Sequence, residues 1–481
     1  MIGSEERRVA DILQDMEDGD HEGEELHWDS GRQTISSLRR GDPTGDGLKF
    51  GNEDLGYGGV EDVSGSIAVT AEQLDAATAT GASVMWRFRS LDGGDVYTAV
   101  NVSDLEPSVS GTVYFSACDE VRCTQPTVAD DECVRLFAQR PPAGGHATAK
   151  PRETVGWTVQ GFVRRGDQWV ETPVTVLPVK EELFCRTRGI LETAVLKDKR
   201  VFVPGEGTIG SHASVGLAES GVGYQFLLDY DRLALENVVR HAAGLSQVGR
   251  YKTRVVADLI RDKNPFACTK TYEQRITWET QDMVRELVRE SDLVICGADE
   301  PTARVILNLL CVQEGKTLIL AGASHRAHAG QVLVVKPQRT ACYQCYRMSG
   351  LGKPADSEVS SSEAAARSAY SNRSVAAEPG LSNDIAPITQ MVIKLAIQQL
   401  LAGTDTTLRS LDEDLSASWF LWINRREAGT EFEHLKPLAC NTNGIHVMRW
   451  YGIGLQRQPA CPVCGDFVGA ASPDLESLLA G

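Results

Sequence analysis

A chain of 481 residues, 42% hydrophobic and 24% charged, has room for two or three packed domains and has the composition of an ordinary globular protein. Its formal net charge of −18 argues against a protein that coats nucleic acid, because such proteins need a basic surface. No apolar run reaches the ~20 residues that cross a bilayer and the N-terminus has no hydrophobic signal core, so we expect the protein to stay in the cytoplasm, where it is made.

The N-terminal sixty residues have the composition of a solvated segment. Residues 1–30 hold eleven Asp or Glu against two Arg, and residues 31–60 are rich in Gly and Asp. Segments of high net charge bury too little apolar surface to offset the entropy of ordering. We therefore predict an acidic, largely disordered region over residues 1–60.

Residues 61–183 show strand-like alternation. Short runs such as GSIAV, SVMWRFRS, TVYFSA and QWVETPVTVLP alternate apolar and polar side chains between turns that contain Gly and Pro. We find no catalytic constellation among them. The pattern predicts a β-rich or α+β accessory domain.

From residue 184 to residue 481 the pattern is α/β. Strand-like runs at 199–205, 224–231, 291–299 and 317–323 alternate with helical runs at 212–222, 253–265 and 302–315. Such alternation predicts a Rossmann-like domain with a mostly parallel sheet covered on both faces. The Ser/Ala-rich stretch 347–382 has no hydrophobic period and is expected to be a long crossover loop, after which an apolar helix follows.

The stretch GEGTIG follows a predicted strand and precedes a predicted helix. Glycines in that context let the backbone approach phosphates, and the helix N-terminus adds amide donors. Asp229, nineteen residues beyond the last of these glycines, ends the next strand and is placed to accept ribose hydroxyls. The motif by itself fits a dinucleotide as well as a mononucleotide; its glycines are Gly205, Gly207 and Gly210.

The residues after GEGTIG favour a triphosphate over a hydride-transfer cofactor. Arg240 and Lys252 supply positive charge suited to a triphosphate whose negative charge rises during transfer. Asp231 and Asn237 lie in the same segment. Asp299 closes a later strand at the same sheet edge, where it could hold the Mg²⁺ that bridges phosphate oxygens. Each residue alone is more often a member of a surface ion pair, but the ordered set predicts a nucleotide site.

Two Cys-x-x-Cys pairs have the number and spacing of ligands of a tetrahedral zinc site. They are Cys342 with Cys345 and Cys461 with Cys464. The long gap between them means that the metal would clamp the C-terminal segment back onto the sheet domain. Four thiols leave no open coordination position, so the predicted role is structural.

Together these motifs resemble the ThiF/MoeB/HesA superfamily, the adenylating domains of ubiquitin-activating enzymes and of sulfur-carrier activators. The resemblance covers roughly residues 184–467 and is carried by GEGTIGS, LLDYD with NVVRH, VGRYK, GADE, GQVLVV, CYQC and CPVCG. It implies ATP-dependent adenylation of the C-terminal glycine of a ubiquitin-like β-grasp protein, with release of pyrophosphate. The extra N-terminal residues suggest docking of a further partner, such as a conjugating enzyme that accepts a thioester.

The resemblance also implies residue roles. The three glycines would line the ATP site, Asp229 would bind ribose, and Asp299 would bind Mg²⁺. Asn237, Arg240 and Lys252 would contact the phosphates. In the family an arginine before the first strand reaches the ATP of the neighbouring subunit, so a homodimer is implied, with Arg188 (or Arg186) acting in trans.

The chain departs from the family pattern at two places. Thr208 stands where the family has a further glycine. Ala376 lies where thiolating relatives carry their reactive cysteine, and the loop around it holds no cysteine. Either the reaction stops at the adenylate, or the thiol comes from elsewhere, with Cys440 the nearest candidate, or a Cys→Ala change is present.

Four alternatives remain beside the leading hypothesis. Three keep the ATP site: a sulfur-carrier-protein adenylyltransferase, an adenylator of a small molecule or peptide, and a catalytically silent ATP-binding scaffold. The fourth, an NAD-dependent dehydrogenase, gives no reason for Arg240 and Lys252 to converge on the phosphate end.

Overall fold

The structure is a computed structural model. It describes residues 66–78, 83–91, 96–99, 108–116, 132–140, 157–349, 380–408, 410–430, 432–438 and 444–466, together with three short strands nearer the N-terminus. Those strands pair antiparallel in the order β1-β3-β2 and are β1 (Glu6–Arg7), β2 (Glu24–Asp29) and β3 (Thr34–Arg39). The other residues of 1–60 lie outside the described part, so their disorder stays a prediction.

A small mixed sheet of eight strands occupies the accessory region. Its strand order is β10-β9-β8-β7-β5-β6-β4-β11. The core beneath it contains Ile67, Leu74, Phe88 and Leu136, all fully buried. The bounds are β4 (Ser66–Thr70), α2 (Ala71–Thr78), β5 (Ser83–Leu91), β6 (Val96–Thr98), β7 (Val109–Ser116), β8 (Glu132–Gln139), β9 (Thr158–Arg165), β10 (Gln168–Thr172) and β11 (Val174–Leu177).

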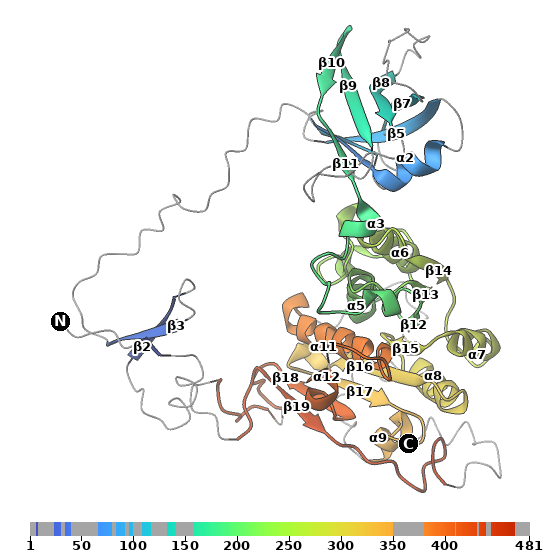
Figure 1. Cartoon of the computed structure of the whole chain (residues 1–481). Helices are drawn as coiled ribbons and strands as arrows, with labels where there is room; N and C mark the ends of the chain where they lie inside the picture. Colours follow the sequence, from blue (N-terminus) through green and yellow to red (C-terminus); the bar gives the residue numbers. More distant parts are fainter. Residues whose placement is uncertain are drawn as a thin grey trace.

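A short connection joins the small sheet to the larger α/β unit, and Figure 1 shows the two stacked one above the other. It consists of α3 (Val179–Glu182), an exposed turn region and α4 (Thr193–Leu196). The backbone N–H of Lys180 donates to Glu72 Oε1 of α2 at 2.6 Å, which ties α3 to the small sheet.

The large unit is built on a second eight-stranded sheet with the order β14-β13-β12-β15-β16-β17-β18-β19. The first five strands run parallel, and the last three continue the sheet antiparallel. The α/β expectation is therefore confirmed, with a sheet that is mixed. The strands are β12 (Arg200–Pro204), β13 (Tyr224–Leu228), β14 (Cys268–Tyr272), β15 (Leu293–Cys296), β16 (Thr317–Ala323), β17 (Ala329–Val335), β18 (Trp419–Ile423) and β19 (Arg449–Ile453).

Helices cover both faces of this sheet and close two separate cores. One face carries α5 (Thr208–Glu219), α6 (Lys252–Lys263) and α11 (Ser382–Leu400), and the other carries α7 (Gln281–Glu290), α8 (Pro301–Gln313) and α9 (Tyr343–Met348). α12 (Ser410–Asp414) packs beside α11. Because both faces are covered, the parallel strands read as continuous apolar runs: all four residues of β15 are buried. None of the described helices is long and apolar enough to cross a membrane.

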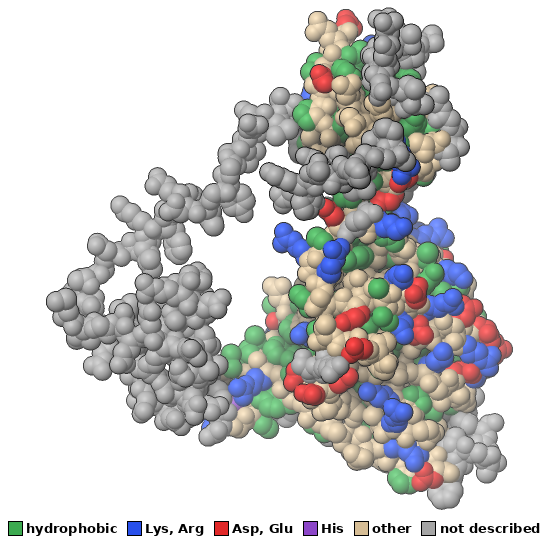
Figure 2. Space-filling model, in the orientation of Figure 1, with side chains coloured by type: hydrophobic (Ala, Val, Ile, Leu, Met, Phe, Trp, Pro, Cys, Tyr) green, Lys and Arg blue, Asp and Glu red, His purple; other side chains and the backbone are tan. Residues whose placement is uncertain are grey.

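Surface charge on the large unit is mixed in sign. Figure 2 shows Lys and Arg interspersed with Asp and Glu over the face in view, rather than gathered into one patch. A field of one sign is what steers a highly charged polymer. The exclusion of a nucleic-acid-coating role stays a prediction from the net charge.

Candidate functional site

A cavity of about 450 Å³ opens where the parallel strands end. In open α/β sheets ligands bind outside the carboxyl ends of the strands, and this volume lies in the usual range for small-molecule sites. The wall combines residues that follow β12, β13, β15 and β16 with residues from the start of α11. Of the predicted nucleotide-binding residues, the lining includes Gly205, Gly207, Asp229, Asp231, Asn237, Arg240, Lys252 and Asp299.

The glycine loop packs too closely for side chains at two of its three glycines. Gly205 has φ +90°, and a Cβ there would lie 2.4 Å from the Ala298 nitrogen. Gly210, in the first turn of α5, would place a Cβ 1.8 Å from Gly205 O. Gly207 differs because a Cβ there would meet nothing within 4 Å. Two glycines therefore shape the loop, while Gly207 leaves open space beside the N-terminus of α5.

Asp229 is held in place by backbone donors. Its Oδ2 accepts from the Glu206 N–H and its Oδ1 from the Asp231 N–H, both at 2.8 Å. Burial raises the pKa of the Asp229 carboxyl, and nearby Lys252 partly offsets the shift. Two fixed hydrogen bonds orient a carboxylate better than solvent does, and this orientation suits a group that must receive ligand hydroxyls.

Lys252 begins α6 and reaches back to the same carboxylate cluster. Its Nζ lies 2.8 Å from Asp231 Oδ2, and the residue is only 8% exposed. Burial alone would lower the pKa of Lys252. The charges of Asp229 and Asp231 outweigh this effect, so the pKa of Lys252 lies above its usual value. The lysine is therefore a protonated point charge at the cavity wall.

Arg240 and Asn237 line the cavity from the segment between β13 and α6. The Asn237 side chain caps its own turn, since Oδ1 accepts from the Ala234 N–H at 3.1 Å and closes the 3₁₀ turn Leu235–Asn237. The Arg240 carbonyl lies 3.2 Å from His212 Nε2 of α5. A Cβ on Gly380, just before α11, would lie 3.7 Å from Arg240 Nη1.

Asp299 lines the cavity beside a second carboxylate. Asp299 is exposed, Glu300 is half-buried, and both line the cavity. Carboxylate oxygens are among the hard oxygen ligands that Mg²⁺ prefers. Beneath them Arg304, 7% exposed, donates to Ala298 O at 2.9 Å and to Ala321 O at 3.0 Å, which fixes the ends of β15 and β16 relative to each other.

Glu206 is a buried carboxyl that our reading of the sequence missed. It is fully buried between two glycines, and Ser214 Oγ of α5 lies 3.1 Å from its Oε1. Burial, reinforced by Asp229, raises its pKa well above the usual value. The only signal in the sequence was an acidic residue inside a glycine motif that directly follows a buried strand.

His241 is a second residue that the sequence reading left unassigned. It is 7% exposed; its Nε2 lies 3.0 Å from Glu206 O, and its Nδ1 accepts from the Ala243 N–H at 3.0 Å. This pattern requires a neutral ring with the proton on Nε2. Burial lowers the pKa of His241 to about 4. The ring thus ties the segment behind Arg240 to the glycine loop.

Tyr230 and Arg275 form one wall of the cavity. The Arg275 guanidinium lies 4.2 Å from the centre of the Tyr230 ring, and both residues line the cavity. Leu228 and Ile276 supply buried apolar surface beside them. This pair could not be predicted from sequence, because Arg275 lies forty-five positions further along the chain than Tyr230.

The four predicted zinc ligands come together away from the cavity. Their sulfur atoms all lie within 4.8 Å of one another, with Cys342 to Cys461 at 3.6 Å and Cys345 to Cys464 at 3.4 Å. Zn–S bonds of about 2.3 Å in a tetrahedron put sulfur atoms about 3.8 Å apart, so the cluster fits the metal. The Gln458 N–H points to Cys345 Sγ at 3.4 Å and supports a thiolate.

Of the remaining positions singled out from sequence, only Thr208 is found in the lining of the described cavity. Arg186 and Arg188 are exposed in the turn region between α3 and α4 and do not line it. Cys440 and Ala376 lie outside the described residues. Gly210 supports the loop from behind without lining the cavity. Thr208, the departure from the family pattern, does line it.

Comparison with known proteins identifies the central part of the chain. Residues 182–417 match the model of the ThiF family. A protein of Branchiostoma floridae named ubiquitin-like modifier-activating enzyme 5 is 29% identical over 197 residues, which are 38% of this chain and 48% of that protein. The adenylyltransferase and sulfurtransferase UBA4 of Lodderomyces elongisporus is 30% identical over 31% of this chain and 32% of its own.

A solved structure, the crystal structure of E. coli MccB with ATP, aligns at a TM-score of 0.40 and 20% identity, over 57% of this chain and 68% of that chain. The chain spans about half or less of the length of these curated relatives.

Proposed function

Residues 182–417 belong to the ThiF family, and from this premise we propose that the protein binds Mg-ATP in the cavity and adenylates the C-terminal carboxylate of a ubiquitin-like β-grasp protein. The observation that carries the proposal is the convergence of the glycine loop, Asp229, Lys252, Arg240 and Asp299 on one cavity. A hydride-transfer site has no need of this convergence of cations and carboxylates.

The nucleotide is proposed to lie along the cavity from the Tyr230 wall to Arg240. The base stacks at the Tyr230–Arg275 end, and the ribose meets Asp229. The phosphates lie over the open space at Gly207 and the N-terminus of α5, where backbone amides and the helix dipole favour anions. Mg²⁺ held at Asp299 would neutralise charge on the phosphate oxygens.

The proposed adenylation needs no proton transfer by side chains of the described cavity. A partner's C-terminal carboxylate is ionised at neutral pH, so its oxygen attacks the α-phosphorus directly. A new O–P bond forms, the bond between the α-phosphorus and the bridging oxygen breaks, and pyrophosphate leaves with the electron pair. Lys252 and Arg240 stabilise the charge that builds up on the phosphates. None of the described cavity residues has to act as a general base.

An ATP–pyrophosphate exchange assay tests the proposal. The full chain, loaded with zinc, should exchange labelled pyrophosphate into ATP only when a cognate β-grasp protein with a free C-terminus is present. Lys252→Ala should lower the rate roughly 100-fold or more, because a buried cation next to the transferring group is lost. Lys263→Ala is the matched control: it lies on the same helix in an exposed ion pair with Glu219 and should change little.

Two finer steps are proposals that depend on the first. Thioester formation would give a DTT-sensitive mass adduct on the chain, and peptide mapping would show whether Cys440 carries it. A homodimer with Arg188 acting in trans predicts that mixing inactive Arg188→Ala and Lys252→Ala chains restores part of the exchange. If the adenylate forms but no adduct appears on the chain, the thioester step is ruled out. If mixing the two variants restores no exchange, the action of Arg188 in trans is ruled out.

The runner-up is a sulfur-carrier-protein adenylyltransferase, and the relative named adenylyltransferase and sulfurtransferase UBA4 supports it. It shares the adenylation step and differs in the partner, so exchange with a sulfur-carrier protein but with no ubiquitin-like protein would favour it. A silent scaffold would bind Mg-ATP without exchange with either. The family membership gives the NAD hypothesis no support.

A further inference from the structure

The turn that joins β16 to β17 holds two residues in an unfavourable backbone conformation. Arg326 has φ 54° and Ala327 has φ 53°, although neither is glycine. In the left-handed region Cβ crowds the backbone, so residues other than Gly persist there only when their surroundings fix them. Ala327 and Ser324 of this turn line the cavity.

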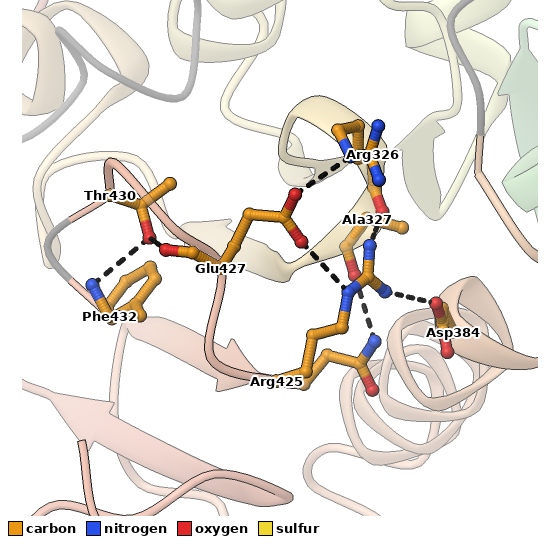
Figure 3. Close-up of polar contacts among 8 residues, drawn as sticks. Arg326, Ala327, Asp384, Arg425, Glu427, Thr430 and Phe432 are labelled. Atoms are coloured by element: carbon orange, nitrogen blue, oxygen red, sulfur yellow. Dashed lines mark hydrogen bonds and ion pairs between the residues drawn. The ribbon is translucent and has the colours of Figure 1, made fainter. Parts of the chain in front are cut away.

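Two consecutive residues after β18 bind both carbonyls of the strained pair. Arg425 Nη2 donates to Arg326 O, and Asn424 Nδ2 donates to Ala327 O at 3.0 Å. Figure 3 shows the Arg425 side chain reaching this turn from the end of β18. The backbone of the same residues is anchored too, since the N–H of Asn424 donates to His328 O at 3.0 Å.

The same guanidinium also holds the first turn of α11. Arg425 Nη1 lies 2.5 Å from Asp384 Oδ2, and its Nε lies 3.1 Å from Glu427 Oε2. Glu427 then pairs with Arg326 Nε at 2.8 Å, which closes the network. A planar guanidinium can serve three acceptors in fixed directions, and a lysine at this position could not.

The turn and the start of α11 meet beside Arg240. A Cβ on Gly380 would lie 3.6 Å from Ala327 Cβ, 3.6 Å from Ile385 Cδ1 and 3.7 Å from Arg240 Nη1. All four residues line the cavity. A shift of the turn or of the start of α11 would therefore displace the cavity wall next to Arg240, the residue expected to contact the phosphates.

We propose that Asn424 and Arg425 are positioning residues that hold the Arg326–Ala327 turn and the first turn of α11 so that the cavity wall beside Arg240 keeps its shape. This inference rests on the proposed adenylation. The residues themselves do not line the cavity. They act through Ala327 and Gly380 on the part of the cavity wall beside Arg240, the residue proposed to contact the phosphates.

Arg425→Met in the full chain tests the inference. We expect about tenfold weaker Mg-ATP binding in calorimetry and a 10- to 100-fold lower kcat for exchange, because small displacements of reacting groups cost rates of this order. The melting temperature should move little, since the ion pairs of Arg425 are partly exposed. Arg426→Met, the exposed neighbour, is the control and should behave as wild type.

A rescue separates a positioning role from a merely structural one. Glycine adopts positive φ without crowding, so Ala327→Gly added to Arg425→Met should restore most of the lost affinity and rate. Arg425→Lys keeps the positive charge but loses the planar guanidinium with its several donors, so it should behave like Arg425→Met. It replaces Arg425→Met in the test if the methionine variant folds poorly. If Arg425→Met matches Arg426→Met, or if Ala327→Gly restores nothing, the inference is wrong.

The two proposals fail in distinguishable ways. If the wild-type chain binds Mg-ATP but shows no exchange with any partner, the adenylation proposal fails, and the calorimetric comparison of Arg425→Met with its rescue still decides the positioning role. If exchange is normal in Arg425→Met, only the positioning role fails. A chain that binds no Mg-ATP would overturn both.

Discussion

At the scale of single residues, the glycines of the loop do two different jobs, and substitution should separate them. Gly210→Ala would put a methyl carbon 1.8 Å from Gly205 O, which the backbone cannot accept, so we expect loss of several kcal/mol of stability or no folded protein. Gly207→Ala meets nothing within 4 Å. It should fold as wild type and weaken Mg-ATP binding about tenfold or more, because the methyl occupies space proposed for phosphate.

Thermal unfolding and calorimetry measure the two effects separately. A Gly207→Ala chain that binds Mg-ATP with full affinity would mean that the phosphates do not pass over this position. A Gly210→Ala chain with unchanged stability would contradict the close approach between the loop and α5.

His241 makes stability depend on pH in a definite direction. Its pKa is about 4 in the folded protein and near 6.5 when unfolded, so below pH 6.5 the unfolded chain binds the extra proton more readily. Stability from this group is present above pH 6.5, is lost as the pH falls towards 4, and amounts to roughly 3 kcal/mol over that window. Protonation would also turn Nδ1 from an acceptor into a donor facing the Ala243 N–H.

Denaturant unfolding of wild type against His241→Gln, from pH 7.5 to 4.5, isolates this contribution. The comparison is needed because Glu206 and Asp229 have raised pKa values, so they favour the folded state as the pH falls. Glutamine can donate to Glu206 O without titrating. As the pH falls, we expect wild type to lose stability relative to His241→Gln. If the two curves of unfolding free energy against pH run parallel, His241 is not a buried neutral ring.

Sequence could place the cavity residues whose position follows from strand ends. Gly205, Asp229 and Asp299 each follow an apolar run, and the ends of parallel strands meet at one edge. Glu206 and His241 could not be found this way, because their roles depend on a hydrogen bond between segments thirty-five residues apart. Arg425 was missed for the same reason: nothing local marks it as the partner of a strained turn.

At the scale of secondary-structure elements, the cysteine cluster should fasten α9 to the segment after β19. We predict one zinc ion per chain by elemental analysis. Cys461→Ser should lose the metal and lower the melting temperature by many degrees, because the metal-binding free energy is coupled to folding. Chelation should do the same to wild type. Cys268→Ser, an exposed cysteine outside the cluster, is the matched control and should keep both metal and stability.

Zinc retained at full stoichiometry in Cys461→Ser would show that the metal is held elsewhere. A melting temperature that stays unchanged after zinc is lost would instead remove the structural role.

The elements themselves were predictable in unequal measure. The parallel half of the sheet could be predicted from sequence, because its strands are apolar runs separated by amphipathic helices. The antiparallel extension was not fully predictable: β19, with the sequence RWYGI, has no buried residue and shows no clear period. Only its pairing with β18 makes it a strand. Tertiary context therefore decided that part of the fold.

At the scale of the whole molecule, the small sheet and the large unit have separate hydrophobic cores. The core that contains Phe88 shares no residue with the two cores on either face of the large sheet. The cavity residues and the cysteine cluster belong to the large unit. Separate cores joined by a short connection are expected to unfold as separate cooperative units.

Scanning calorimetry of the full chain should therefore show two transitions. Mg-ATP at 100 times its Kd should stabilise only the large unit, by about 2.7 kcal/mol, because the ligand binds that folded unit and not the unfolded chain. Phe88→Leu, a change at a fully buried position of the small core, should lower only the other transition. If one transition responded to both the ligand and the substitution, the two units would fold as one, and the accessory region would have to be treated as part of the nucleotide-binding domain.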